Sequence, residues 1–140
     1  MTTRPVFPSG LYGVTPDWDD LDQLTQAIEA AARGGMTVLQ WRHKTCPASR
    51  MIGMAREVKR VCHANGVLLM INDHWRVAEA VGADGVHVGR DDDSPNAVRL
   101  ALGPDALIGV SCYGELNHAK EMLAQGVDYG QRFSGLSSVL

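Results

Sequence analysis

Short apolar runs rich in β-branched residues alternate along the chain with longer amphipathic stretches. The short runs are typical of buried strands, and the stretches, with apolar positions three and four residues apart, are typical of helices. We predict strands at Leu11–Thr15, Met36–Arg42, Val67–Asn72, Gly85–Gly89 and Leu107–Cys112, with a sixth beginning at Val127. We predict helices at Asp20–Arg33, Ala48–Asn65, Trp75–Val81, Ser94–Leu102 and Glu115–Gln125. This strict alternation predicts an α/β protein whose parallel strands are joined by helical crossovers.

Glycine, serine and proline support these boundaries. Gly34-Gly35 and Gly103-Pro104 follow predicted helices, and both pairs are typical helix terminators. Ser94-Pro95 predicts an N-cap serine followed by proline at the first helical position.

Chain length separates two parallel architectures. The 140 residues hold five strand–helix units and the start of a sixth. A (β/α)₈ barrel needs roughly 200 residues or more, whereas an open, flavodoxin-like sheet fits this length. Length alone therefore favours the open sheet. The last segment, Gly130–Leu140, has neither strand alternation nor a helical stripe, so it is either a frayed terminus or an abnormal end.

Composition excludes several classes of protein. Hydrophobic residues make up 45% and charged residues 21%, which suits a packed core. The net charge of -3 and the lack of a basic run argue against nucleic-acid binding, and the apolar runs are too short to span a membrane. Met1–Gly10 lacks a signal-peptide pattern, and Cys46, Cys62 and Cys112 suggest neither a disulfide framework nor a zinc site. We therefore expect a soluble, reduced, cytoplasmic protein.

Cationic residues follow the second predicted strand. Because side chains alternate along a strand, Gln40, Arg42 and Lys44 can share one face. In parallel α/β folds, ligands bind at the carboxyl ends of the strands. An anion such as phosphate would satisfy these groups there, and the alternative is a strand that simply ends in solvent.

Carboxylates follow the next two predicted strands. Asn72-Asp73 ends one apolar run, and Asp91-Asp92-Asp93 follows another. Carboxylates from neighbouring strand ends can share Mg²⁺ that also binds substrate phosphates. Two alternatives stay open, because an acidic run suits the start of a helix and Asp73 suits the N-cap of the helix beginning near Trp75.

Three further residues are weaker candidates. Ser111 follows the fifth apolar run and could donate to a phosphate or cap a helix. His87 lies within an apolar strand, which favours a hydrogen-bonded core histidine over a ligand. Cys112 has no evident partner base, so we expect no nucleophile. The glycines form no nucleotide-binding pattern.

Several of these segments together resemble the thiamine-phosphate synthase family, which includes thiazole tautomerases. The resemblance spans roughly residues 11 to 129 and rests on motifs that occur in the family's order. They are Leu11-Tyr12-Gly13-Val14-Thr15, Gln40-Trp41-Arg42-His43-Lys44, Asn72-Asp73, His87-Val88-Gly89-Arg90-Asp91-Asp92, Ile108-Gly109-Val110-Ser111 and Gly126-Val127-Asp128-Tyr129.

The resemblance implies an incomplete (β/α)₈ TIM barrel of about five βα units plus the start of a sixth strand, in place of the open sheet. Residues 11–129 would form this partial barrel, after an N-terminal extension (1–10) and before an aberrant or frayed tail (130–140). The implied reaction is Mg²⁺-dependent. It joins hydroxymethylpyrimidine diphosphate to thiazole phosphate, giving thiamine phosphate and pyrophosphate.

The resemblance also implies roles for individual residues. The pyrimidine diphosphate would contact Gln40, Arg42, Lys44, Asn72 and Ser111, and Mg²⁺ would be held by Asp73 and Asp92. In the family the pyrimidine methylene gains carbocation character before the thiazole nitrogen attacks, so no protein nucleophile is required.

After Tyr129 the chain departs from the family pattern. Family members continue into a Thr- and Lys-bearing loop that binds both substrates, and Gly130–Leu140 does not resemble it. We therefore expect a C-terminally truncated chain with the diphosphate and Mg²⁺ half of the site. One alternative is an inactive fragment or pyrimidine-diphosphate-binding remnant that self-associates through open barrel edges. Another is a small α/β signalling domain with Asp73 as phosphoacceptor.

Overall fold

The structure is a computed structural model that describes residues 8–89, 94–111 and 129–131. The strands are β1 (Leu11–Val14), β2 (Met36–Trp41), β3 (Leu68–Asn72), β4 (Gly85–Val88), β5 (Leu107–Ser111) and β6 (Tyr129–Gln131). The helices are α1 (Leu21–Arg33), α2 (Ala48–Ala64), α3 (Trp75–Val81) and α4 (Pro95–Leu102). None of these helices is long and apolar enough to cross a membrane.

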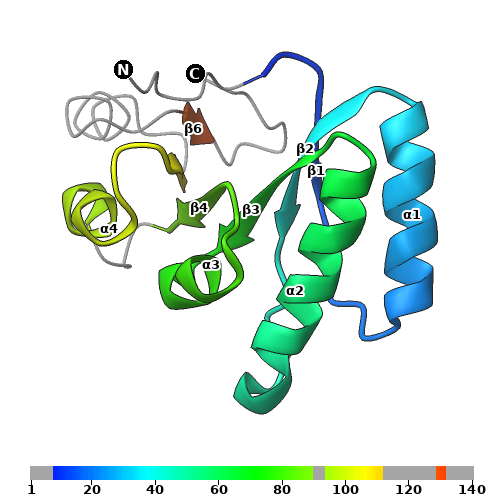
Figure 1. The fold of residues 1–140 in the computed structure, drawn as a ribbon, viewed down its shortest axis with the longest axis horizontal. Helices are drawn as coiled ribbons and strands as arrows, with labels where there is room; N and C mark the ends of the chain where they lie inside the picture. Colours follow the sequence, from blue (N-terminus) through cyan, green and yellow to red (C-terminus); the bar gives the residue numbers. More distant parts are fainter. Residues whose placement is uncertain (1–7, 90–93, 112–128, 132–140) are drawn as a thin grey trace.

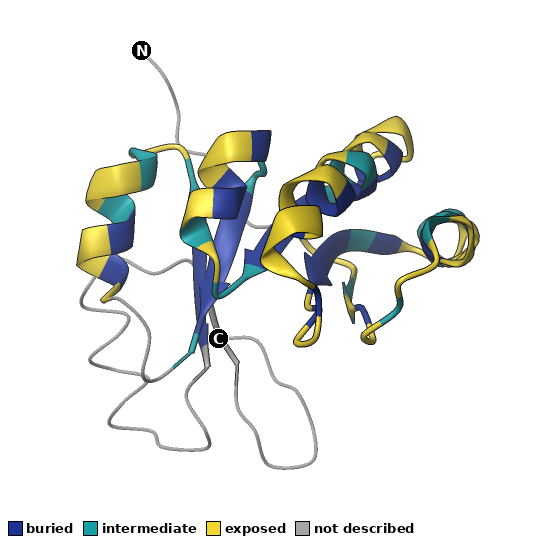
Figure 2. Ribbon diagram, turned by 90° about the horizontal axis from the view of Figure 1, so that it is seen from below, coloured by how far each residue is buried: buried dark blue, intermediate teal, exposed yellow. Residues whose placement is uncertain are grey.

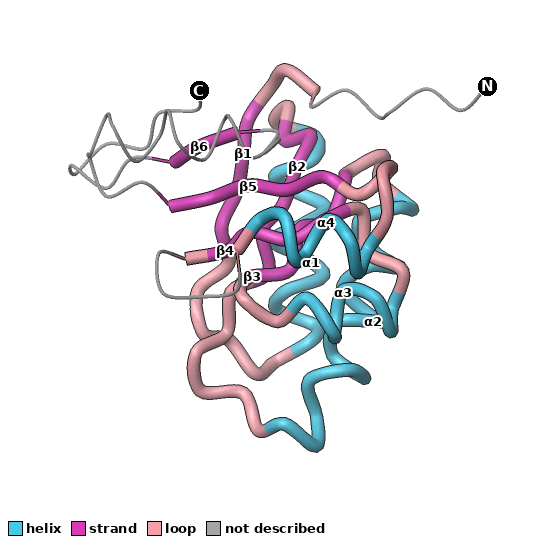
Figure 3. The backbone as a smooth tube through the Cα atoms, turned by 90° about the vertical axis from the view of Figure 1, so that its left-hand side faces the viewer, coloured by secondary structure: helices cyan, strands magenta, loops and turns pink. Residues whose placement is uncertain are grey.

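The described strands form one parallel sheet in the order β1-β2-β3-β4-β5-β6 (Figure 1). Each strand therefore pairs with its neighbours in the chain, as in a barrel. A flavodoxin-like sheet has the order 2-1-3-4-5 and carries helices on both faces. Here the helices lie on the same side of the strands (Figure 3). The open sheet favoured by length, which the signalling-domain alternative requires, is thus wrong.

The predicted elements agree closely with the observed ones. Trp75–Val81 is helical as predicted. The predicted N-cap of α4 is confirmed, because Ser94 Oγ accepts from the Ala97 N–H at 3.2 Å and Pro95 follows it. The predicted helix Glu115–Gln125 lies outside the described residues. Strand β6 begins two residues after Val127 and extends two residues beyond position 129, where we expected the domain to end.

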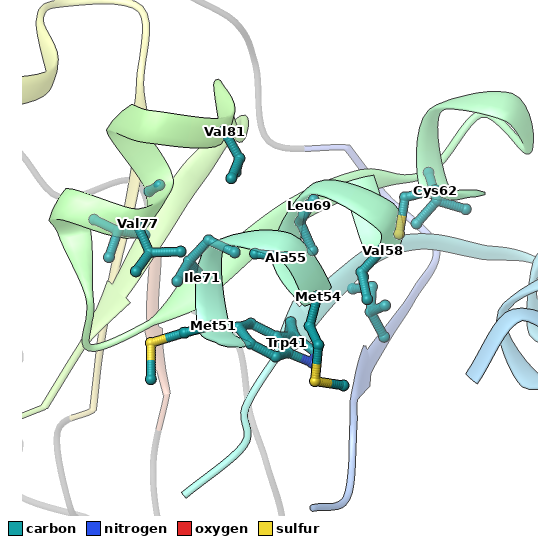
Figure 4. Packing of buried hydrophobic residues seen from close by; sticks show 14 of the residues in the cluster. Trp41, Met51, Met54, Ala55, Val58, Cys62, Leu69, Ile71, Val77 and Val81 are labelled. Carbon is teal, nitrogen blue, oxygen red and sulfur yellow. The ribbon is translucent and has the colours of Figure 1, made fainter. Parts of the chain in front are cut away.

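The main core lies between the sheet and the helices. Alternate residues of β2 and β3 point toward α2, whose apolar face packs on them (Figure 4). Trp41, Leu69 and Ile71 are at most 3% exposed in this layer. The helical side of the cluster includes Met51, Met54, Ala55, Val58 and Cys62. Figure 2 shows the same division, with buried positions along the strands and exposed positions on the outer helix faces.

The other face of the sheet changes in character along the strands. Near the amino ends it is apolar, with Val38, Met70 and Leu107 packed against Tyr12 and Leu68. Two polar residues follow toward the carboxyl ends, Gln40 and His87, and both are buried. A buried polar layer requires hydrogen-bonding partners, so this end of the sheet is the place to examine for a site.

Candidate functional site

Asp73 directly follows β3 in an unusual backbone conformation. Its φ is 63°, and it is the one non-glycine residue with positive φ in the described part of the chain. Its N–H donates to the His87 carbonyl at 2.7 Å, which ties this turn to β4. Positive φ is costly for a residue with a side chain and is often found at functional sites.

The Asp73 carboxylate binds Lys44. Lys44 Nζ lies 2.7 Å from Asp73 Oδ2, and the two side chains are 45% and 23% exposed. The N-cap of α3 is His74, and its side chain makes no capping bond. The alternative in which Asp73 caps this helix is therefore wrong. The fold instead joins two predicted site residues from the carboxyl ends of β2 and β3.

A row of hydrogen bonds crosses the polar layer beside this ion pair. Gln40 Nε2 donates to the Tyr12 hydroxyl at 2.8 Å, and Asn72 Nδ2 donates to Gln40 Oε1 at 2.9 Å. Gln40 is only 2% exposed, so both ends of its amide are held by neighbouring strands. The row fixes the orientation of two predicted site residues and adds Tyr12, which the sequence analysis missed.

His87 belongs to the same face of the sheet and is 1% exposed. Burial lowers the pKa of its imidazole from 6.5 to about 4. The negative charge of Asp73 opposes this shift, and the positive charge of Lys44 adds to it. The ring is therefore neutral near pH 7, as expected for a core histidine.

The remaining predicted residues are placed less completely. Arg42 follows β2 with an exposed side chain, and its N–H donates to Thr15 Oγ1 at 2.9 Å. Ser111 ends β5, and its side chain lies outside the described part of the structure. Asp92 also lies outside the described residues.

Two side chains of the β1–α1 turn also reach this end of the sheet. Asp17 Oδ1 accepts from the Lys44 N–H at 2.9 Å, and Asp19 Oδ1 accepts from His43 Nε2 at 2.7 Å. The sequence analysis missed both residues. An acidic turn before a helix is ordinary, and no local spacing connects it to residues more than twenty positions away.

Among the described residues, no three His, Cys, Asp or Glu side chains lie together as a metal site, and Asp73 is the predicted Mg²⁺ ligand that these residues include. Magnesium prefers oxygen ligands and commonly takes one or two carboxylates, completing its shell with water and phosphate oxygens. Asp73 offers one carboxylate at a strand end, and its charge is already paired with a cation, the Lys44 ammonium. The two thiols in the described residues do not compete for such a role, because Cys46 and Cys62 are buried and burial raises the pKa of Cys62 to about 12.

Comparisons with known proteins show similarity over most of the chain. A family model described as "Thiamine monophosphate synthase" matches residues 11–131. The chain is 50% identical to a thiamine-phosphate synthase of Bordetella pertussis over 123 residues, which cover 88% of this chain and 57% of the relative. It is 47% identical to one of Chromobacterium violaceum over 120 residues, which cover 86% of this chain and 58% of the relative.

A solved structure agrees with these matches. A thiamine phosphate pyrophosphorylase from Pyrococcus furiosus superposes with a TM-score of 0.77 at 28% identity, covering 89% of this chain and 60% of that one. The chain thus spans somewhat more than half the length of the proteins that it resembles.

Proposed function

The chain belongs to the thiamine monophosphate synthase family, and from this premise we propose that its strand-end residues bind hydroxymethylpyrimidine diphosphate together with Mg²⁺. The proposed reaction transfers the pyrimidinylmethyl group to the nitrogen of a thiazole phosphate. Its products are thiamine phosphate and pyrophosphate. Both substrates are charged phosphate esters, which cross membranes poorly, so we also propose that the reaction takes place in the cytoplasm.

The Lys44–Asp73 ion pair is the observation that supports this function best. Its atoms lie 2.7 Å apart beside the Gln40–Asn72 row. A magnesium diphosphate carries one charge of each sign that this ion pair can bind. The Asp73 carboxylate would bind the metal, and the Lys44 ammonium would bind the phosphate oxygens. Each side chain would therefore exchange its present partner for one part of the ligand without leaving a charge unpaired.

The chain's own residues would bind and orient the pyrimidine diphosphate. Lys44 would act as a point charge on the phosphates and Arg42 as a bidentate donor. These cations would stabilise the negative charge that develops on the departing pyrophosphate. Bound at Asp73, with Asp92 as the second expected ligand, Mg²⁺ would supply further positive charge to that group.

The buried amide row would hold the other end of the substrate. Gln40 is fixed by Tyr12 and Asn72, so it would hold the half-buried Asn72 side chain in a fixed orientation beside a pyrimidine ring. Rigid placement lowers the entropic cost of aligning the reacting carbon. No protein nucleophile enters this scheme.

Thermal unfolding with ligands tests the proposal. We expect Mg²⁺ and hydroxymethylpyrimidine diphosphate together to raise Tm by several degrees, and either one alone to raise it much less, because their charges are complementary. Asp73→Asn and Lys44→Met should each remove most of the joint effect. Asp22→Asn removes an exposed charge of α1 and is the matched control. An equal rise in Tm for the unaltered chain and Asp73→Asn would refute the proposed site.

A further inference from the structure

The turn after β1 is bound at three points to the segment after β2. These bonds join Thr15 Oγ1 to the Arg42 N–H, Asp17 Oδ1 to the Lys44 N–H, and Asp19 Oδ1 to His43 Nε2. We call the two bound segments, residues 15–19 and 42–44, the loop clasp. Every residue of 42–44 takes part, and two of these residues are the cations assigned above to the diphosphate.

The loop clasp is anchored in the core and reaches the surface. The His43 side chain is 0% exposed, whereas that of Asp19 is 67% exposed. The His43 ring also packs edge-on against Trp41, with ring centroids 6.2 Å apart. His43 therefore cannot move without disturbing the core, and its bond to Asp19 secures the turn to a fixed point.

The backbone of residues 42–44 lies beyond the end of β2, where strand pairing no longer holds it. The loop clasp takes over that role through a hydroxyl and a carboxylate, which accept from the N–H groups of Arg42 and Lys44. With its backbone held in this way, Lys44 reaches Asp73, which directly follows the neighbouring strand β3.

We propose that Asp17 and Asp19 are positioning residues, which hold Arg42 and Lys44 ready to receive the diphosphate. This inference rests on the proposed function and extends it to two carboxylates that touch neither the metal nor the substrate. They act on the ligand only through the residues that they bind.

The direction in which Kd changes distinguishes a positioning role from simple charge repulsion. Asp17 and Asp19 bring two negative charges close to a site for an anion, so Coulomb repulsion alone would weaken pyrophosphate binding. Removing either charge should then strengthen binding if the carboxylates have no positioning role. Positioning predicts the opposite, because loss of the carboxylate frees the backbone that holds Lys44.

The test measures binding of inorganic pyrophosphate with Mg²⁺ to the 140-residue chain by titration calorimetry. We expect Asp17→Ala and Asp19→Ala each to raise Kd about tenfold, which corresponds to about 1.4 kcal/mol. Asp19→Asn retains an oxygen that accepts from His43, so its Kd should stay within about threefold of the unaltered chain. Asp22→Ala removes a nearby exposed charge outside the loop clasp and should not raise Kd.

A Lys44→Ala background separates positioning from general damage. Residues that act through one another are not additive, so Asp17→Ala should change Kd less than about twofold once Lys44 is gone. An equal tenfold loss in both backgrounds would overturn the positioning role, and so would tighter binding by the alanine variants. Amide hydrogen exchange provides a measurement without ligand, because Asp17→Ala should speed exchange of the Lys44 N–H.

The failures of the two proposals differ. If the unaltered chain does not bind magnesium pyrophosphate, the proposed function fails, and the positioning role fails with it. If the unaltered chain binds and Asp19→Ala binds equally well, only the positioning role fails. Should Asp17→Ala or Asp19→Ala not fold, Asp17→Glu and Asp19→Glu decide the question, because they keep the negative charge but move the accepting oxygen by one methylene group. Positioning then predicts a raised Kd, and an unchanged Kd would overturn it.

Discussion

Replacing His87 by glutamine should flatten the dependence of stability on pH. His87 is 1% exposed on the inner face of β4, and burial lowers its pKa from 6.5 to about 4. The unfolded chain therefore takes up a proton at this residue before the folded protein does. The free energy of unfolding that this pKa difference contributes is fully present above about pH 6.5 and is lost as pH falls toward about 4.

The size of the effect follows from the shift. Each pKa unit corresponds to about 1.4 kcal/mol, so the full difference approaches about 3 kcal/mol. Between pH 7 and pH 5 the linkage relation gives a loss of about 2 kcal/mol. Glutamine does not titrate, so His87→Gln should lack this loss even where it lowers stability at pH 7.

Urea unfolding at both pH values, in buffer without metal, measures the effect. The other histidines and the carboxylates are common to both proteins, and their contributions cancel in the difference. His74→Gln is the matched control, because it makes the same substitution at an exposed position. Parallel losses of stability in the unaltered chain and His87→Gln would refute the assigned pKa and its cause.

Three further predictions concern packing and edges. Gly85→Ala should cost about 3 kcal/mol in urea unfolding, because the added methyl would meet backbone atoms of Leu107; a loss under about 1 kcal/mol would contradict this close approach. Asp84→Ala should cost about 1–3 kcal/mol, because Asp84 Oδ2 accepts from the Leu69 N–H at 2.8 Å, and Asp84→Asn should recover most of it. Equal losses for the two variants would disprove that account. Leu11 and Val14 are 60% and 44% exposed on the edge strand β1, so we expect self-association that increases with concentration. Light scattering should show less of it for the double variant Leu11→Lys, Val14→Glu. No change in self-association would show that β1 is not the edge through which the chains associate.

The strands and helices were predictable because their signals are local. Buried runs such as Gly85–Val88, the Ser94-Pro95 start of α4 and the helix Trp75–Val81 all follow from periodicity and capping chemistry within a few residues. The resemblance to a known family added the barrel architecture. Chain length pointed instead to an open sheet, and this was wrong because length does not determine which strands pair.

The candidate site was predictable only in part. Strand ends indicated Gln40, Lys44 and Asp73 as neighbours, since parallel strands place their carboxyl ends together. The same reasoning could not find Tyr12 or His43, because their roles depend on partners across the fold.

The sequence by itself thus determined the elements, their parallel arrangement and the edge of the sheet where polar chemistry gathers. Only the tertiary structure decided how these groups pair: Lys44 with Asp73, Gln40 with Asn72, and the loop clasp across residues 15–19 and 42–44. The physical reason is one of range. Hydrophobic periodicity and caps act over one or two turns of chain, whereas a hydrogen bond between strand ends depends on the register of the sheet and on the conformation of each loop.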